Sequence, residues 1–162
     1  MRQVRKIRIH WPINGSSLAG LAAGKTEAFE SDEDMRLLLE LLRSTPQLGD
    51  FGVYSHVFEA GIGFEGFTTG AGANPTLGMV GERTVSPTII FTTYLDADTG
   101  EELLQVILSR LVGVHPWEIP VIELSEPFHL VARQAAGAQD LDAALPSHRR
   151  DIAYATGLHE QS

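Results

Sequence analysis

The sequence predicts an α+β domain of the ferredoxin-like class, a split βαβ unit with a four-stranded antiparallel sheet and two helices on one face. Three observations predict it. Strand-like and helix-like segments follow one another as strand, helix, strand, strand, helix, strand, the order of the split βαβ unit. The chain of 162 residues is 43% hydrophobic, enough for one ordinary core. Both helical segments are amphipathic, so each has one face to bury on a sheet.

The first predicted strand covers residues 4–13. Its apolar and polar side chains alternate, the period of a half-buried strand, and Ile7, Ile9 and Trp11 share the apolar face. Residues 14–26 are rich in glycine, alanine and serine. We interpret them as a connection or the poorly formed start of a helix.

The two predicted helices have apolar stripes at helical spacing. The first begins after Ser31, with acidic residues in its first turn, and ends before Pro46. The second follows residues 96–99 and ends at Gly113. The stripes are Met35, Leu38, Leu39 and Leu42 in the first helix, and Leu104, Ile107, Leu108 and Leu111 in the second.

The other predicted strands cover residues 51–58, 88–95 and 117–124, which are rich in aromatic and β-branched residues. Glycines within residues 61–66 predict a bend or bulge after the first of them. Residues 127–135 are interpreted as a short final helix.

The sheet face without helices needs a cover. We expect five aromatic residues to lie on this uncovered face. A sheet this small should not leave so much apolar surface in water. We therefore expect a homo-oligomer, a trimer in preference to a dimer. The five residues are Trp11, Tyr54, Phe58, Phe91 and Trp117.

Composition limits the function classes. A formal charge of −9 argues against a nucleic-acid binder, which needs a concentrated basic face. Without cysteine there are no disulfides and no thiolate ligands, so any metal must be bound by His, Asp or Glu. No apolar run reaches the ~20 residues of a membrane span, and we expect a cytoplasmic protein. Residues 1–136 form the predicted domain, and residues 137–162 a loosely docked or disordered tail.

Two segments stand out as the candidate site. Residues 67–78 form a glycine-rich loop between strand patterns, and residues 115–123 follow the second helix with a His-Pro-Trp-Glu sequence. Imidazole and carboxylate groups suit zinc, copper or a similar divalent ion. No nucleophile motif and no pair of catalytic carboxylates accompanies them, which favours binding over catalysis.

The quoted segments resemble a known family. Tyr54-Ser-His56, Gly70-Ala-Gly-Ala-Asn-Pro-Thr-Leu-Gly-Met-Val-Gly81 and His115-Pro-Trp-Glu-Ile-Pro120 are similar to the CutA/PII-like module inserted in Nif-three-like (YqfO-type) proteins. That module has a Tyr-x-His strand, a G-x-G-A-N-P-x-x-G-x-x-G loop and an H-P-Y-E-E strand in this order. The resemblance covers about residues 4–124. The last segment is also similar to the H-P-Y-E-V-P sequence of CutA divalent-cation-tolerance proteins, which are ferredoxin-like trimers.

The resemblance implies site residues on the matching positions. The metal ligands would be His56, His115 and Glu118. An alternative is structural: His115 and Glu118 anchor the backbone while Asn74 and Pro75 fix the loop turn. The loop could also bind an anionic ligand through its N–H groups, as PII-like sheets bind effectors at subunit clefts. The implied ligand-binding residues are Gly70, Gly72, Asn74, Pro75, Gly78 and Gly81.

Three functions follow as hypotheses. The favoured one is a non-catalytic, oligomeric regulatory module that senses a small ligand or divalent metal at subunit clefts. The second is a CutA-like metal-binding or metal-tolerance protein. The third is a small metal-dependent hydrolase, although the metal-binding halves that flank the module in Nif-three-like proteins are absent from this sequence.

Overall fold

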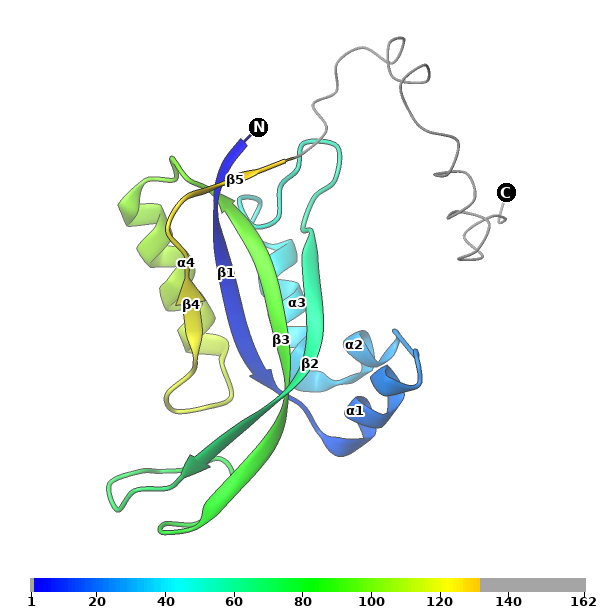
Figure 1. Ribbon diagram of the computed structural model, residues 1–162, viewed down its shortest axis with the longest axis vertical. Helices are drawn as coiled ribbons and strands as arrows, with labels where there is room; N and C mark the ends of the chain where they lie inside the picture. The colour runs from blue at the N-terminus through cyan, green and yellow to red at the C-terminus, as the bar shows by residue number, and fades with distance from the viewer. Residues whose placement is uncertain (1, 132–162) are drawn as a thin grey trace. The chain divides into compact units, whose positions relative to one another are not determined.

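The computed structural model describes residues 2–131, of which Arg2–Leu130 form one compact unit. A five-stranded antiparallel sheet has the order β2-β3-β1-β4, and β5 also pairs with β1 (Figure 1). The predicted α+β class is confirmed. The tail predicted at residues 137–162 lies outside the described residues. The strands are β1 (Arg2–Pro12), β2 (Phe58–Thr68), β3 (Arg83–Asp96), β4 (Ile122–Leu124) and β5 (Phe128–Leu130).

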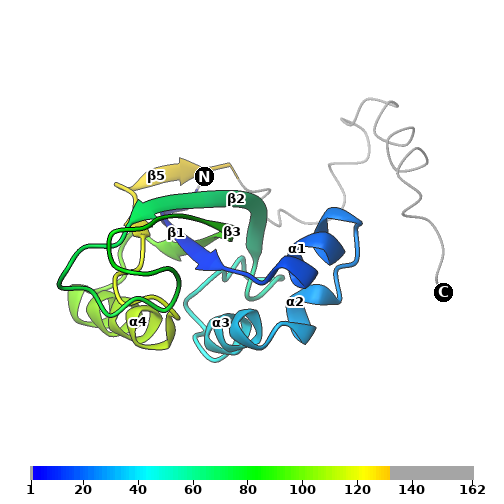
Figure 2. The same ribbon diagram turned by 90° about the horizontal axis from the view of Figure 1, so that it is seen from below.

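Two of the four helices in the described part were expected, α3 and α4. They lie side by side beneath the sheet in Figure 2. Asp32 caps α3 by accepting a hydrogen bond from the Met35 amide at 3.1 Å. The other two occupy the predicted connection, where the Asn14 side chain caps α1 through the Ser17 amide at 2.8 Å. The helices are α1 (Gly15–Ala22), α2 (Ala28–Ser31), α3 (Glu33–Arg43) and α4 (Glu101–Val114).

The core lies between the sheet and the helices, and it contains Trp11 and Phe91, both fully buried. We expected both on the uncovered sheet face, and that expectation was wrong. Trp11 shares the helix-covered face of β1 with Ile9, and Ile9 is paired in register with Phe91. The large apolar side chains of these strands therefore stabilise the monomer itself.

The other three aromatic residues also contribute little to an uncovered sheet face. Phe58 is half-buried and packs against the core, with its ring 5.1 Å from that of Phe91. Tyr54 is exposed but lies in the loop before β2, outside the sheet. Trp117 is half-buried in the segment that follows α4.

Strand β2 differs from its predicted bounds. It begins at Phe58, where the predicted strand ends, and its register with β3 continues through the glycines of residues 61–66 without the expected bulge. Gly63 has a packing reason, because a Cβ there would lie 2.9 Å from Cδ1 of Ile90 on the neighbouring strand. Gly63 thus serves close strand packing, and the three glycines do not end the strand.

The C-terminal elements also differ. Within residues 117–124, only Ile122–Leu124 pairs with β1 as a strand. Residues 128–130 form β5, which pairs with Arg2–Val4, where we expected the start of a helix. Phe128 packs against Tyr94, and the Lys6 ammonium lies 5.5 Å from the centre of the Phe128 ring. These contacts with distant segments favour the strand.

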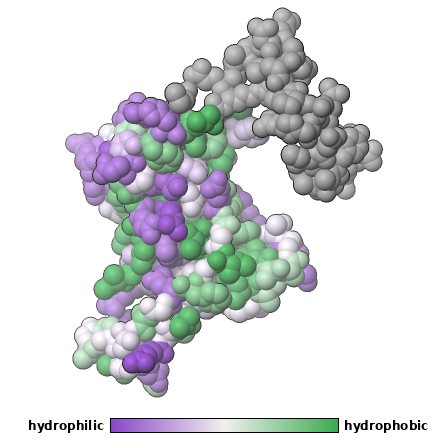
Figure 3. All heavy atoms as spheres, viewed as in Figure 1, coloured by the Kyte–Doolittle hydropathy of each residue, from purple (hydrophilic) through white to green (hydrophobic). Residues whose placement is uncertain are grey.

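Strands β2 and β3 extend beyond the rest of the sheet as a two-stranded arm. Their pairing continues to Thr68 and Arg83, whereas β1 stops at Pro12, opposite Thr88 (Figure 1). Phe64 is 68% exposed on this arm. Figure 3 shows further apolar surface over the part of the molecule that contains α1 and α2.

Candidate functional site

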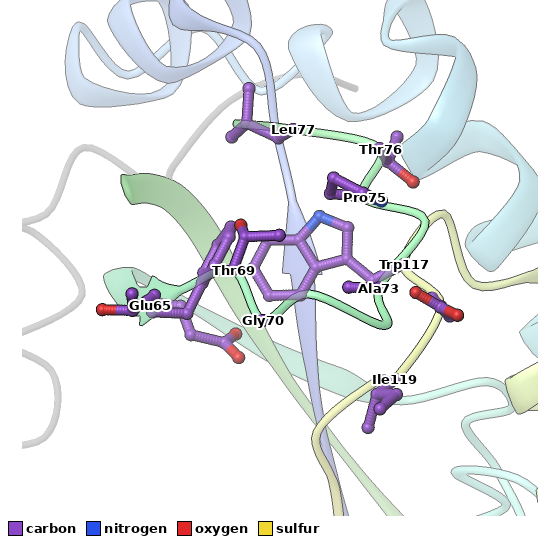
Figure 4. Close-up of a pocket in the computed structure, with 12 residues that line it drawn as sticks. Glu65, Thr69, Gly70, Ala73, Pro75, Thr76, Leu77, Trp117 and Ile119 are labelled. Atoms are coloured by element: carbon purple, nitrogen blue, oxygen red, sulfur yellow. The ribbon is translucent and has the colours of Figure 1, made fainter. Parts of the chain in front are cut away.

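A cavity of about 290 Å³ lies where the end of β2 and the loop that follows it meet a segment far away in sequence. The loop is residues 69–82, and the distant segment is residues 115–121 after α4. Figure 4 shows the labelled side chains around the Trp117 indole, with Glu65 and Thr69 on one side and Pro75 and Leu77 above it. The cavity is lined by Glu65, Phe67, Thr68, Thr69, Gly70, Ala73, Pro75, Thr76, Leu77, Trp117, Glu118 and Ile119.

The loop is folded on itself by backbone hydrogen bonds. At its base, the Thr69 amide donates to the Glu82 carbonyl at 3.1 Å, and the Gly81 amide donates to the Thr69 carbonyl at 2.8 Å. Within it, the Ala73 amide donates to the Gly70 carbonyl at 3.2 Å. Several of its amides are therefore already satisfied inside the loop.

Two loop glycines adopt positive φ, with values of 81° at Gly78 and 85° at Gly81. Only Gly78 is also crowded, because a Cβ there would lie 2.4 Å from Thr84 Oγ1, whereas nothing lies within 4 Å of the equivalent point at Gly81. Comparing the two glycines therefore distinguishes the effect of a positive φ, which both have, from the effect of steric crowding, which only Gly78 has.

Gly78→Ala is expected to lower the free energy of unfolding by about 2–3 kcal/mol, because it adds a steric clash to the strain of a left-handed residue. Gly81→Ala, the matched control, carries the backbone term alone, about 1–2 kcal/mol. Urea denaturation of both variants measures the difference. Equal losses would contradict the contact between Gly78 and Thr84.

His115 is buried, with 8% of its surface exposed, and both its ring nitrogens bind backbone. Nε2 donates to the His10 carbonyl at 2.8 Å, and Nδ1 accepts from the Trp117 amide at 3.0 Å. A carbonyl only accepts and an amide only donates, so these bonds select one neutral tautomer. Burial lowers the pKa of His115, and the bond to the His10 carbonyl offsets part of that shift. Its ring also packs edge-on against Trp11, at 4.7 Å between centroids.

Glu118 ties this segment to the glycine loop. Its Oε2 accepts a hydrogen bond from the Asn74 amide at 3.0 Å. Beside it, Thr76 Oγ1 donates to the Pro116 carbonyl at 2.9 Å. These two bonds hold together two walls of the cavity.

The proposed metal ligands are not brought together. His56 lies in the loop before β2, at the opposite end of that strand from residues 69–82. His115 and Glu118 use their polar atoms to hold backbone. Within residues 2–131, no group of three His, Asp or Glu side chains is placed to hold a metal ion. The contacts of His115 and Glu118 are those of the structural alternative.

The six implied ligand-binding residues divide into three groups. Gly70 and Pro75 line the cavity. Asn74 supplies its backbone amide to Glu118. The remaining three, Gly72, Gly78 and Gly81, are not lining residues.

Sequence reasoning missed Glu65 as a lining residue. It placed Phe67 and Ile119 within the two candidate segments without giving them a role, and it assigned Trp117 to the sheet face. Phe67 and Trp117 lie edge to face, with ring centroids 5.7 Å apart. A local signal existed for Glu65, which stands as a carboxylate among the glycines of residues 61–66. The segment that supplies Trp117 is 50 residues away from it, and no local pattern predicts that meeting.

Glu65 has an unusual environment. Its Oε2 is buried and has no hydrogen-bond partner in the described part of the chain, and the same holds for Thr69 Oγ1. Burial raises the pKa of Glu65, and the nearby His10 offsets part of the rise. His10 in turn lies 3.5 Å from Glu123, through Nε2 and Oε1. A buried carboxylate oxygen without a hydrogen-bond partner lowers the stability of the folded protein.

Glu65→Gln is expected to leave stability at pH 7 unchanged or higher. An acid whose folded pKa is raised opposes folding once it ionises, so the gain should appear as the pH rises above about 4.5 and vanish below it. Thermal unfolding of both proteins between pH 3 and pH 8 measures this difference. The charged groups near Glu65, which are His10 and its neighbours Glu123 and Arg8, are present in both proteins. Glu59→Gln, on the same face of β2, is the control. A Glu65→Gln variant less stable at pH 7 would contradict the prediction.

Comparison with known proteins gives a structural neighbour. The chain superposes on the crystal structure of a Bacillus cereus protein related to NIF3 with a TM-score of 0.51 and 16% sequence identity. The match covers 78% of this chain and 26% of that one, so this chain spans about a quarter of its neighbour. At this identity the match supports the fold alone. No protein-family model matches the sequence, and no curated protein does so.

No helix within residues 2–131 is both long enough and apolar enough to cross a lipid bilayer.

Proposed function

We propose that the protein is a non-catalytic binding module that takes a small organic ligand in the cavity between β2, the loop of residues 69–82 and the segment after α4. One observation carries this proposal. Two segments about 40 residues apart in sequence, residues 65–77 and 117–119, meet around a mainly apolar cavity. They are held together by the bond from the Asn74 amide to Glu118 and the bond from Thr76 to the Pro116 carbonyl. Convergence of this kind is typical of ligand sites.

We also propose that the fold is ferredoxin-like. The strand order β2-β3-β1-β4 with antiparallel neighbours agrees with a ferredoxin-like sheet, to which β5 adds a short strand. The resemblance of the loop and the His-Pro-Trp-Glu segment to the module of Nif-three-like proteins agrees with the NIF3-related neighbour. We propose that this chain contains a form of that module.

Binding is favoured over catalysis by the residues that line the cavity. The twelve include no Ser, Cys, His or Lys. Of the two carboxylates, Glu118 already accepts from the loop backbone. A hydrolase would need a positioned nucleophile or metal-bound water, and these lining groups favour neither.

Self-association is the second part of the proposal. The arm formed by β2 and β3 exposes Phe64 and Val85, and Ile119 beside the cavity is 82% exposed. Apolar side chains that project in this way fit a contact between copies of the chain.

Native mass spectrometry of the untagged protein tests both parts, because one spectrum gives the number of subunits and any bound mass. The expected result is an oligomer that carries an organic molecule, retained after treatment with EDTA and lost in Trp117→Ala. A bound metal removed by EDTA would favour the metal hypothesis. A monomer without a bound molecule would contradict the proposal.

A further inference from the structure

We propose that the ligand is a small organic cation, an apolar or aromatic body that carries a protonated primary amine, and that the amine pairs with the carboxylate of Glu65. This inference rests on the proposed function and names its ligand class. It follows from the charge of the cavity walls, the bonding of the loop amides and the aromatic surface.

The charge of the walls is the first argument. Two lining residues are acidic, Glu65 and Glu118, and none is Lys, Arg or His. His10, the imidazole near Glu65, is not among the lining residues. An anionic ligand would meet two carboxylates in a partly desolvated site, where such repulsion is strong. A cation meets the opposite situation.

The second argument concerns the loop amides, which could otherwise bind an anion. The Asn74 amide is directed to Glu118, and the amides of Ala73 and Gly81 donate to loop carbonyls. The Thr69 and Glu82 amides are also used, by the carbonyls of Glu82 and Met79. An anion cradle needs several amides directed at one point, and these five amides are directed to protein oxygens and do not contribute to one.

The third argument identifies the free polar groups. Glu65 Oε2 is buried without a hydrogen-bond partner among residues 2–131, and Thr69 Oγ1 is in the same state. A carboxylate that lacks donors of its own is unfavourable, and the Glu65 side chain lines the cavity, so an ammonium bound there gains a charge-assisted hydrogen bond to it. Burial raises the pKa of Glu65, which fits a group whose counter-charge comes from the ligand.

The aromatic surface completes the match. Phe67 and Trp117 meet edge to face in the cavity wall, with Pro75, Leu77 and Ile119 nearby in the lining. Aromatic faces attract cations, and they also pack against an apolar ligand body.

Three probes of similar shape test the ligand class: phenethylamine, 2-phenylethanol and 3-phenylpropionate. Binding is followed by the change in tryptophan fluorescence and by calorimetry at low and high salt. Trp117 lines the cavity, whereas Trp11 is fully buried and is not a lining residue. We expect phenethylamine to bind about 10- to 100-fold more tightly than the alcohol, and the carboxylate to bind most weakly. Added salt should weaken the binding of phenethylamine but not that of 2-phenylethanol.

Glu65→Gln should lower the affinity for phenethylamine about 10- to 100-fold and leave the alcohol unchanged. Glu59→Gln, on the same strand and face, should change neither. If the alcohol or the carboxylate binds as tightly as the amine, the ligand class is wrong and the binding site stands. If none of the three binds at up to about 10 mM, a limit for so small a ligand, both proposals fail.

Discussion

Replacing His115 with alanine is expected to lower the free energy of unfolding by about 2–4 kcal/mol. The substitution leaves the Trp117 amide and the His10 carbonyl without their partner, and it removes the ring that packs on Trp11. Urea denaturation at pH 7.5, with and without EDTA, measures the loss. We expect EDTA to have no effect on either protein, because this role involves no metal.

The same comparison has a pH dependence. A histidine whose pKa is lowered by folding stabilises the protein as the neutral form, so its contribution is complete above the ordinary imidazole pKa of about 6.5. It is lost as the pH falls below that value. The gap in stability between the wild type and His115→Ala should therefore narrow between pH 7 and pH 5.

His56→Ala is the matched control, at the far end of β2, with an expected change within about 0.5 kcal/mol. The metal hypothesis predicts a different pattern. It requires zinc or copper to stabilise the wild type, and both His56→Ala and His115→Ala to abolish that effect while the protein remains folded. That pattern would overturn the structural role assigned to His115.

Replacing Trp11 with alanine is expected to have the largest effect, a loss of about 3–5 kcal/mol. Trp11 is fully buried between the sheet and the helices, and its removal leaves a cavity beside His115. Trp117→Ala is the control with the same change in side chain. Because Trp117 is half-buried and its amide still binds His115, we expect a loss of about 1–2 kcal/mol.

Chemical denaturation of the two tryptophan variants, followed by circular dichroism, gives both values in one experiment. The result also decides whether Trp117 can be removed in binding studies without unfolding the protein. A larger loss for Trp117→Ala than for Trp11→Ala would contradict the assignment of Trp11 to the core.

The periodic elements were predictable because their signal is local. The stripe from Met35 to Leu42 lies within α3, and the alternation of residues 7–11 lies within β1. Strand β2 was misplaced because its glycines suggest a bend, while pairing with β3 keeps it continuous. Strand β5 depends on pairing with Arg2–Val4, more than 120 residues away in sequence, which no local pattern encodes.

The site was predictable in its segments but not in its contacts. The glycine loop and the His-Pro-Trp-Glu segment do meet, yet Glu118 binds a backbone amide where a metal was expected. Chemical type alone did not distinguish a ligand from an anchor, because imidazole and carboxylate groups can serve as either. Glu65 entered the site only through the packing of the arm against residues 117–119.

The bond between Asn74 and Glu118 has a consequence for sequence variation. Asn74 contributes its amide, which every residue except proline possesses, while Glu118 contributes a side-chain oxygen. Position 74 should therefore accept most substitutions in a library of variants selected for folding, while position 118 should retain residues able to accept a hydrogen bond. Two neighbours in one contact would then show opposite degrees of tolerance, and the asparagine would be the freer of the two to change.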